Sequence, residues 1–224
     1  MRKQNQDRSL VKEFPDGTIL LAVADGAGGE PEGERAAEIA RETLTGFDPH
    51  STDITAQFVE SMRAADQKIV DIVTARPDLK GMGTTMTAAF FRERTVHWAH
   101  VGDSRLYLFS GGKLVQITED DTMAGFLLTE GEITREEAWV HPGRNMLFEC
   151  IGCGEFEAET GSFAVIKSDL LLLTTDGLHD KITEETMLAV LKRDAALRDK
   201  LEALVSAALE ASGKDNATVV GLEV

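Results

Sequence analysis

Four aspartates in this sequence stand where apolar runs end or where turns begin, and carboxylates in such places can bind divalent cations. They are Asp7, Asp25, Asp176 and Asp215. Asp25 directly follows the apolar run 19–24, Asp176 comes shortly after the run 170–173, and a glycine follows each of these two acids. A buried carboxylate is costly unless it is paired or binds a cation. Because the set offers oxygen ligands only, it favours Mg²⁺ or Mn²⁺ over softer metals.

The chemistry that such a set could perform is the transfer of a phosphoryl group to water. Two divalent ions roughly 4 Å apart can bridge one water, acidify it and direct it at phosphorus. Arg2 lies five residues before Asp7, and a guanidinium group can hold two phosphoryl oxygens at once. The alternative is that each Asp-Gly pair is an ordinary turn. The recurrence of the pattern favours convergence of the acids on metal ions.

Length and composition indicate one globular domain with a substantial core. The chain has 224 residues, of which 42% are hydrophobic and 28% are charged. A net charge of −16 argues against nucleic acid or an anionic membrane as the main partner. No apolar run approaches the roughly 20 residues of a membrane span and no secretory signal is visible, so we expect a cytoplasmic protein. Cys150 and Cys153 are expected to be reduced, with a labile disulfide or a metal contact as open alternatives.

Hydrophobic periodicity and turn residues predict a segregated order of helices and strands. After an irregular segment 1–17, a strand at 18–24 precedes two helices, one at 34–44 and one from Asp53 to before Pro77. The middle of the chain is predicted to be an antiparallel meander with strands at 84–91, 95–101, 105–109 and 114–117. The strands expected after it are 146–151, 159–166, 170–174 and 217–224, with two further helices between the last two.

Segment 118–149 differs from its surroundings because it is acidic and loop-like. A capping box formed by Thr134 and Glu137 predicts a short helix within it, and we interpret the segment as a flap over a site. The order of elements is typical of an α+β fold with a central antiparallel β-sandwich flanked by helix pairs, in four layers α-β-β-α. We therefore expect residues 1–224 to form a single catalytic domain with a flap-like insertion around 118–149.

Several short motifs follow one another in an order that covers nearly the whole chain. They are Arg2-x-x-Asn5-Gln6-Asp7, Val23-Ala24-Asp25-Gly26-Ala27-Gly28-Gly29, Gly83-Thr84-Thr85, His100-Val101-Gly102-Asp103-Ser104-Arg105, Gln116-x-Thr118-x-Asp120, His141-Pro142-x-Arg144-Asn145, Asp176-Gly177-Leu178-x-Asp180 and Asp215-Asn216-x-Thr218. Each motif is weak by itself, but their joint order is highly specific. In this order the sequence resembles the metal-dependent serine/threonine protein phosphatases, the type 2C or PPM family, in their compact bacterial form.

The resemblance implies a protein serine/threonine phosphatase that uses Mn²⁺ or Mg²⁺. A hydroxide that bridges two divalent metals would hydrolyse phosphoserine or phosphothreonine. The implied partner is a phosphorylated protein, the target of a serine/threonine kinase, and a monomer is the expected state. The implied site roles are Asp25 bridging both metals, Gly26 offering its carbonyl oxygen, Asp176 and Asp215 binding one metal, Asp7 acting through water, Arg2 holding the phosphoryl group and Asp103 binding a third metal.

The sequence departs from the pattern of the family at a few positions. Glu30 stands where bacterial relatives often have His, and Asp121 replaces a usual His. The metal-binding Asp that such flaps carry has no obvious match. Glu30 and the near-terminal position of Arg2 motivate an alternative, a non-catalytic or regulatory partner-binding module of the same fold. Binding of Mn²⁺ or Mg²⁺ would discriminate the enzyme from that module.

Overall fold

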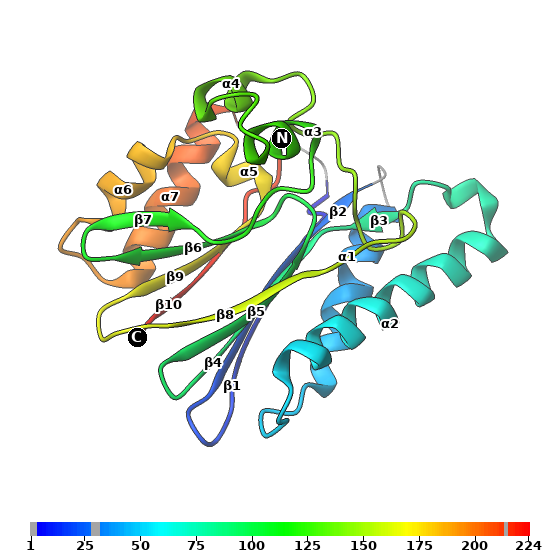
Figure 1. The fold of residues 1–224 in the computed structure, drawn as a ribbon, viewed down its shortest axis with the longest axis horizontal. Coiled ribbons are helices and arrows are strands. Elements are labelled where there is room, and N and C mark those ends of the chain that lie inside the picture. The colour runs from blue at the N-terminus through cyan, green and yellow to red at the C-terminus, as the bar shows by residue number, and fades with distance from the viewer. Residues whose placement is uncertain (1–3, 28–31, 213–214) are drawn as a thin grey trace.

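Two antiparallel sheets lie face to face between pairs of helices in the computed structural model, which describes residues 4–27, 32–212 and 215–224 (Figure 1). The first sheet has the order β1-β2-β4-β5-β8, and β3 also pairs with β2. Its strands are β1 (Asp7–Glu13), β2 (Ile19–Ala27), β3 (Gly83–Thr84), β4 (Met86–Arg92), β5 (Thr95–Val101) and β8 (Glu159–Ala164). The second sheet has the order β10-β9-β6-β7 and consists of β6 (Arg105–Ser110), β7 (Lys113–Gln116), β9 (Leu170–Thr174) and β10 (Val219–Glu223).

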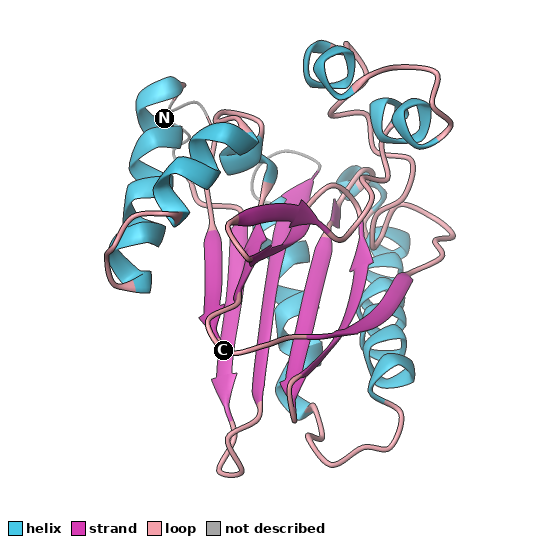
Figure 2. Ribbon diagram, turned by 60° about the vertical axis from the view of Figure 1, so that its left-hand side comes forward, coloured by secondary structure: helices cyan, strands magenta, loops and turns pink. Residues whose placement is uncertain are grey.

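The long helices cover the outer faces of the two sheets (Figures 1 and 2). Helices α1 (Glu32–Thr43) and α2 (Ile54–Ala75) pack on the first sheet, and α6 (Glu184–Leu191) and α7 (Leu197–Ala211) pack on the second. The shorter helices are α3 (Met123–Thr129), α4 (Arg135–Val140) and α5 (Asp176–His179), with 3-10 turns at Leu44–Gly46 and Pro77–Leu79. Within the described ranges, no helix combines the length and the apolar character needed to cross a membrane.

Three apolar clusters hold the four layers together. Leu21 and Val23 of β2 pack with Leu171 and Leu173 of β9 in the layer between the sheets. Leu20 lies in the cluster between the first sheet and its helices, since successive side chains of a strand point to opposite faces. A third cluster joins the second sheet to α6 and α7. Strand β2 is therefore buried on both faces, and the predicted four-layer α-β-β-α sandwich is confirmed.

The prediction of an irregular segment at 1–17 is wrong for residues 7–13, which form strand β1. This strand lies at an edge of the first sheet, and among the described strands it pairs with β2 alone. Buried and half-buried side chains alternate along it with exposed ones, among them Val11. An edge strand buries little apolar surface, so its sequence carries a weak strand signal.

The predicted meander is also wrong, because its four strands are two hairpins in different sheets. Strand β5 pairs with β4 and β8 in the first sheet, whereas β6 pairs with β7 and β9 in the second. The chain crosses from one sheet to the other at residues 102–104, where Gly102 has a φ of +107°. Turn residues indicate where a strand ends, but they do not indicate which sheet receives the next strand.

Residues 146–151 do not form the predicted strand. Their ladder contacts are isolated bridges, Thr122 with Leu147 and Thr84 with Ile151. Cys150 and Cys153 form a disulfide in the adjoining turn, so the expectation of reduced cysteines is wrong and the disulfide alternative holds. The 118–149 segment contains α3 and α4, and the capping box at the start of α4 is confirmed.

Candidate metal centre

Five carboxylates from distant parts of the chain meet at one end of the sandwich. Asp7 begins β1, Asp25 lies near the end of β2, Asp103 lies in the crossing between the sheets, Asp176 follows β9 and Asp215 precedes β10. Asp7 and Asp25 lie opposite each other in the antiparallel ladder of β1 and β2. Electrostatic interactions connect Asp25 to Asp7, Asp103 and Asp176, and connect Asp215 to Asp7 and Asp176. The structure therefore brings together all the acids that the sequence singled out.

Two threonine hydroxyls hold the side chain of Asp7. The Oγ1 atoms of Thr175 and Thr218 donate to Asp7 Oδ2 at 2.8 and 2.6 Å. The backbone amide of Thr218 in turn donates to Thr175 Oγ1 at 3.0 Å. Asp7 is buried, and these bonds join the first strand of the chain to the end of β9 and to the approach to β10. The position of Asp7 is thus set by both sheets.

The backbone of Asp25 is held by the two threonines that follow Gly83. Thr84 Oγ1 and the amide of Thr85 donate to the carbonyl oxygen of Asp25 at 2.8 and 2.9 Å. The amide of Asp25 donates to Thr85 Oγ1 at 3.0 Å. Thr85 also shares a 2.7 Å hydrogen bond with Ser104, the residue after Asp103. One threonine hydroxyl therefore links the turn of Asp103 to the strand of Asp25.

The glycines after Asp25 and Asp176 allow backbone segments to approach too closely for any side chain. A Cβ atom on Gly26 would lie 2.0 Å from the carbonyl oxygen of Gly33 in α1. A Cβ atom on Gly177 would lie 1.7 Å from the carbonyl oxygen of Asn216. These two contacts explain why the Asp-Gly pairs recur, since the absence of a side chain is what permits the approach.

The electrostatics of the cluster are dominated by burial and by repulsion between its carboxylates. Burial, together with the carboxylates of Asp7, Asp176 and Asp103, raises the pKa of Asp25 well above its usual value. Burial, with Asp215 as the next cause, raises the pKa of Asp176 to about 6. Burial also raises the pKa of Asp103 and of Asp7. Carboxylates crowded in this way are stabilised when a cation lies among them.

One oxygen of this cluster has no partner in the described structure. Asp176 Oδ1 is buried without a hydrogen bond, a costly arrangement unless an ion binds there. Within the described ranges, no three acidic, histidine or cysteine side chains are arranged to hold an ion by themselves. A hard divalent ion that keeps several waters fits such an incomplete set of oxygen ligands. The residues present therefore suit Mg²⁺ or Mn²⁺.

Two of the residues singled out from the sequence lie outside the described residues. They are Arg2, expected to hold the phosphoryl group, and Glu30, where relatives often have His. The ligand roles expected of Asp7, Asp25, Asp176 and Asp215, of the Gly26 carbonyl, and of Asp103 for a third metal all stay predictions.

Buried His100 braces the turn that carries Asp103. Its Nε2 atom lies 2.9 Å from the carbonyl oxygens of Gly102 and Glu119, and its Nδ1 atom lies 2.8 Å from Thr87 Oγ1. Because carbonyl oxygens only accept, Nε2 carries the hydrogen. Burial lowers the pKa of His100 to about 4, so this imidazole is neutral. These contacts give His100 a structural role beside Asp103.

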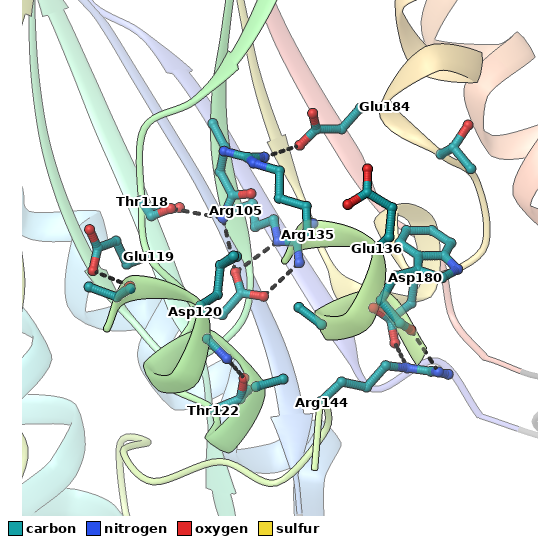
Figure 3. A pocket seen from close by; sticks show the side chains of 18 of the residues that line it. Arg105, Thr118, Glu119, Asp120, Thr122, Arg135, Glu136, Arg144, Asp180 and Glu184 are labelled. Atoms are coloured by element: carbon teal, nitrogen blue, oxygen red, sulfur yellow. Dashed lines mark hydrogen bonds and ion pairs between the residues drawn. The ribbon is translucent and has the colours of Figure 1, made fainter. Parts of the chain in front are cut away.

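The 118–149 segment contacts the metal centre through two neighbouring residues. Asn145 Nδ2 donates to Asp176 Oδ2 at 3.2 Å. Arg144 Nε forms an ion pair with Asp180 Oδ2 at 3.1 Å (Figure 3). Asp180 follows directly after α5, the helix that starts at Asp176. The segment thus lies against the acid cluster, and its role as a flap stays a prediction.

Sequence reasoning missed the residues that position the acids. Thr85 and Thr218 were part of the motifs and Thr175 directly precedes one of them, but no role was assigned to these threonines, and Asn145 was not connected to Asp176. The signal that could have found the threonines is a hydroxyl within a few residues of each acid, because buried carboxylates require donors. The Asn145 contact joins residues 31 positions apart, so local sequence could not indicate it.

Comparison with known proteins agrees with this geometry. The family model described as "Protein phosphatase 2C" matches residues 2–216. The chain belongs to the protein phosphatase 2C family. Its relatives include the serine/threonine phosphatase stp of Listeria monocytogenes, 36% identical over 230 residues, with 100% of this chain and 91% of the relative covered.

Another relative in the protein phosphatase 2C family is the serine/threonine protein phosphatase PstP of Mycobacterium tuberculosis. It is 37% identical over 225 residues, which cover 97% of this chain but only 44% of PstP. The chain thus spans less than half the length of that relative. Among solved structures, the catalytic domain of PstP in complex with two manganese ions matches with a TM-score of 0.87 and 35% identity, covering 100% of this chain and 93% of that chain.

Proposed function

We propose that this protein is a metal-dependent serine/threonine protein phosphatase that hydrolyses phosphoserine or phosphothreonine in protein substrates. The observation that carries the proposal is the convergence of Asp25, Asp176 and their neighbours around a buried carboxylate oxygen that has no hydrogen-bond partner among the described residues. Membership of the protein phosphatase 2C family supports it, as do the related serine/threonine phosphatases, one of which was solved in complex with two manganese ions.

The proposed ligands of the ions are carboxylates from both sheets together with one backbone carbonyl. Asp25, Gly26, Asp176 and Asp215 would hold two ions, Asp7 would act through water, and Asp103 would bind a third. When bound, Mn²⁺ or Mg²⁺ would acidify a water and offset the charge of the phosphoryl oxygens. The chain's own contribution is to fix the carboxylates through the Thr175, Thr218 and Thr85 contacts and to orient the phosphoryl group through Arg2.

The proposal extends to the organisation and the setting of the enzyme. Residues 1–224 would act as one catalytic domain, with the 118–149 segment as a flap beside the metal centre. The substrates would be targets of a serine/threonine kinase, and the enzyme would work as a monomer in the cytoplasm. Light scattering after size-exclusion chromatography tests the monomer, and incubation with kinase-phosphorylated proteins tests the substrates.

Loss of activity in an Asp25→Asn variant tests the function directly. With Mn²⁺ present, the wild-type protein should release phosphate from a phosphothreonine peptide, and Asp25→Asn should lower kcat by at least a hundredfold. Asp194→Asn, at an exposed aspartate between α6 and α7, is the matched control and should retain activity. Full activity in Asp25→Asn would contradict the proposal. Absence of Mn²⁺ and Mg²⁺ binding in calorimetry would favour the alternative of a non-catalytic or regulatory partner-binding module.

A further inference from the structure

A pocket of about 750 Å³, which we call the flap pocket, lies between the 118–149 segment and the second sheet (Figure 3). Helices α3 and α4 form one wall, and residues of β6, β7 and the start of α6 form the other. Leu128 and Trp139 contribute apolar surface to it. None of the five clustered carboxylates is among the described residues that line it.

Acidic side chains outnumber basic ones in the lining of the flap pocket. The six carboxylates are Glu119, Asp120, Glu136, Asp180, Glu184 and Glu185. The three guanidinium groups are Arg105, Arg135 and Arg144. A pocket with this balance in a chain of net charge −16 attracts cations and repels anions.

Each arginine of the flap pocket is already engaged by a carboxylate. Arg105 binds Asp120 through two hydrogen bonds of 2.8 and 2.6 Å. Arg135 pairs with Glu184 at 2.9 Å, and Arg144 pairs with Asp180 (Figure 3). These pairs use half of the carboxylates, and each guanidinium group of the lining already has an anionic partner.

Two of the remaining carboxylates have no cationic partner. In the part of the chain that the structure describes, neither Glu136 of α4 nor Glu185 of α6 takes part in an ion pair. They lie on opposite walls of the flap pocket, one on the 118–149 segment and one on the second-sheet side. Trp139, on the same helix as Glu136, offers an aromatic ring beside which a cationic side chain can also lie.

The flap pocket adjoins the metal centre. Asp180 lines the pocket. It lies one helical turn after Asp176, a distance of roughly 6 Å along the axis of helix α5. Arg144 lines the pocket as well, and its neighbour Asn145 contacts Asp176. In an extended peptide, side chains two residues apart are separated by about 7 Å and lie on the same face. A peptide whose phosphorylated residue lies at the acid cluster could therefore place a nearby side chain in the flap pocket.

We propose that the flap pocket receives a lysine or arginine side chain of the phosphoprotein substrate, two or three residues from the phosphorylated residue. The alkyl part of that side chain packs against Leu128 and Trp139, and its charge lies between Glu136 and Glu185. This inference rests on the proposed phosphatase function and adds to it a class of substrate, phosphorylated segments with a basic residue nearby.

The test compares phosphothreonine peptides that differ at one position only. Each carries lysine, or the uncharged norleucine of similar length, at position −3, −2, +2 or +3 in an otherwise alanine-rich sequence. The wild-type enzyme with Mn²⁺ should show a kcat/KM about three- to tenfold higher for lysine at one of these positions, as expected for one or two partly exposed charge pairs. Raising the salt concentration should reduce that ratio, because exposed charges are screened.

Variants of the two unpaired glutamates connect the preference to the flap pocket. Glu136→Gln combined with Glu185→Gln should reduce the lysine-to-norleucine ratio to below twofold, and any general change in turnover cancels in that ratio. Glu132→Gln, at an exposed glutamate outside the lining, is the matched control and should keep the ratio. Glu136→Lys combined with Glu185→Lys should reverse the preference toward a glutamate-bearing peptide.

The outcomes separate this inference from the proposed function. If every peptide is hydrolysed but none shows a lysine preference, or if the preference survives the double glutamine variant, the flap pocket does not select basic residues. If no phosphopeptide is hydrolysed in the presence of Mn²⁺, the phosphatase function and this inference are both overturned.

Discussion

Asn145 of the 118–149 segment donates a 3.2 Å hydrogen bond to Oδ2 of Asp176, while Oδ1 of the same carboxylate is buried and accepts no hydrogen bond from the residues that the structure describes. One oxygen is thus oriented by the segment and the other is left for an ion. The contact gives Asn145 the role of a positioning residue for the metal centre.

Replacing Asn145 should therefore weaken metal binding before any substrate is present. In Asn145→Ala the Asp176 carboxylate loses its donor, and we expect the affinity for Mn²⁺ to fall roughly fivefold, as for the loss of about 1 kcal/mol from one hydrogen bond. Calorimetric titration with Mn²⁺ measures this directly. Asn145→Ser, which keeps a shorter donor, should recover part of the affinity. Identical affinities in Asn145→Ala and the wild type would show that the contact does not position Asp176.

The hydroxyls that hold Asp7 should contribute to the stability of the fold. Thr218→Val keeps the shape of the side chain but removes the 2.6 Å donor to Asp7 Oδ2. We expect the free energy of unfolding to fall by about 1.5–3 kcal/mol, the range for hydrogen bonds to charged groups. Urea denaturation of the metal-free protein provides the measurement.

Thr160→Val is the control for this effect, because Thr160 is an exposed residue in a strand of the same protein. Its free energy of unfolding should stay within about 0.5 kcal/mol of the wild type. Equal decreases in the free energy of unfolding for Thr160→Val and Thr218→Val would mean that the hydrogen bond to Asp7 does not stabilise the fold.

The acid cluster should make the metal-free protein less stable than it would be with one acid fewer. Asp25→Asn removes a carboxylate that repels its neighbours. We therefore expect the free energy of unfolding of the metal-free variant to be about 1–2 kcal/mol higher than that of the metal-free wild type. Excess Mn²⁺ should reverse the order, because an ion that binds only the folded state stabilises it. Thermal unfolding with and without Mn²⁺ tests both halves. A metal-free variant less stable than the wild type would contradict the repulsion.

Buried His100 should make the protein sensitive to acid. Its pKa is about 4 in the folded protein and about 6.5 in an unfolded chain, so the unfolded state binds the proton first. The stability that this residue contributes is present above pH 6.5 and is lost as the pH falls from 6.5 toward 4, by about 3 kcal/mol in total. Burial dominates the shift, and the nearby Asp120 and Arg105 act in opposite directions.

Urea denaturation at several pH values between 4 and 7 measures that loss. In His100→Gln the slope of the unfolding free energy against pH over this range should become smaller. His50→Gln, at a histidine whose side chain is 75% exposed, is the matched control. An unchanged slope in His100→Gln would show that other groups cause the acid sensitivity.

The sequence predicted most of the fold because the responsible signals are local. The apolar run before Asp25 and the amphipathic stripe of α2 each report burial within a few residues. Strand β1 was missed because an edge strand leaves Val11 and other side chains exposed. The sheet crossing at residues 102–104 was missed because the same turn can lead into either sheet.

The acids of the metal centre could be found from the sequence, but their supports could not. Asp25 and Asp176 each end an apolar run, which is visible in the chain itself. The hydroxyl of Thr218 reaches an acid 211 positions away, and the amide of Asn145 reaches one 31 positions away. Such contacts depend on the packing of whole layers, which no local pattern describes.

Asp25 belongs to the first sheet, whereas Asp176 follows a strand of the second. Any ion that binds both carboxylates would therefore connect the two sheets of the sandwich. Its coordination distances would depend on how the two sheets pack against each other. Leu21 and Leu171 pack between the two sheets. Their volume therefore helps to set the distance between the carboxylates of the two sheets. Catalytic defects can then arise from interior substitutions that leave every acid intact.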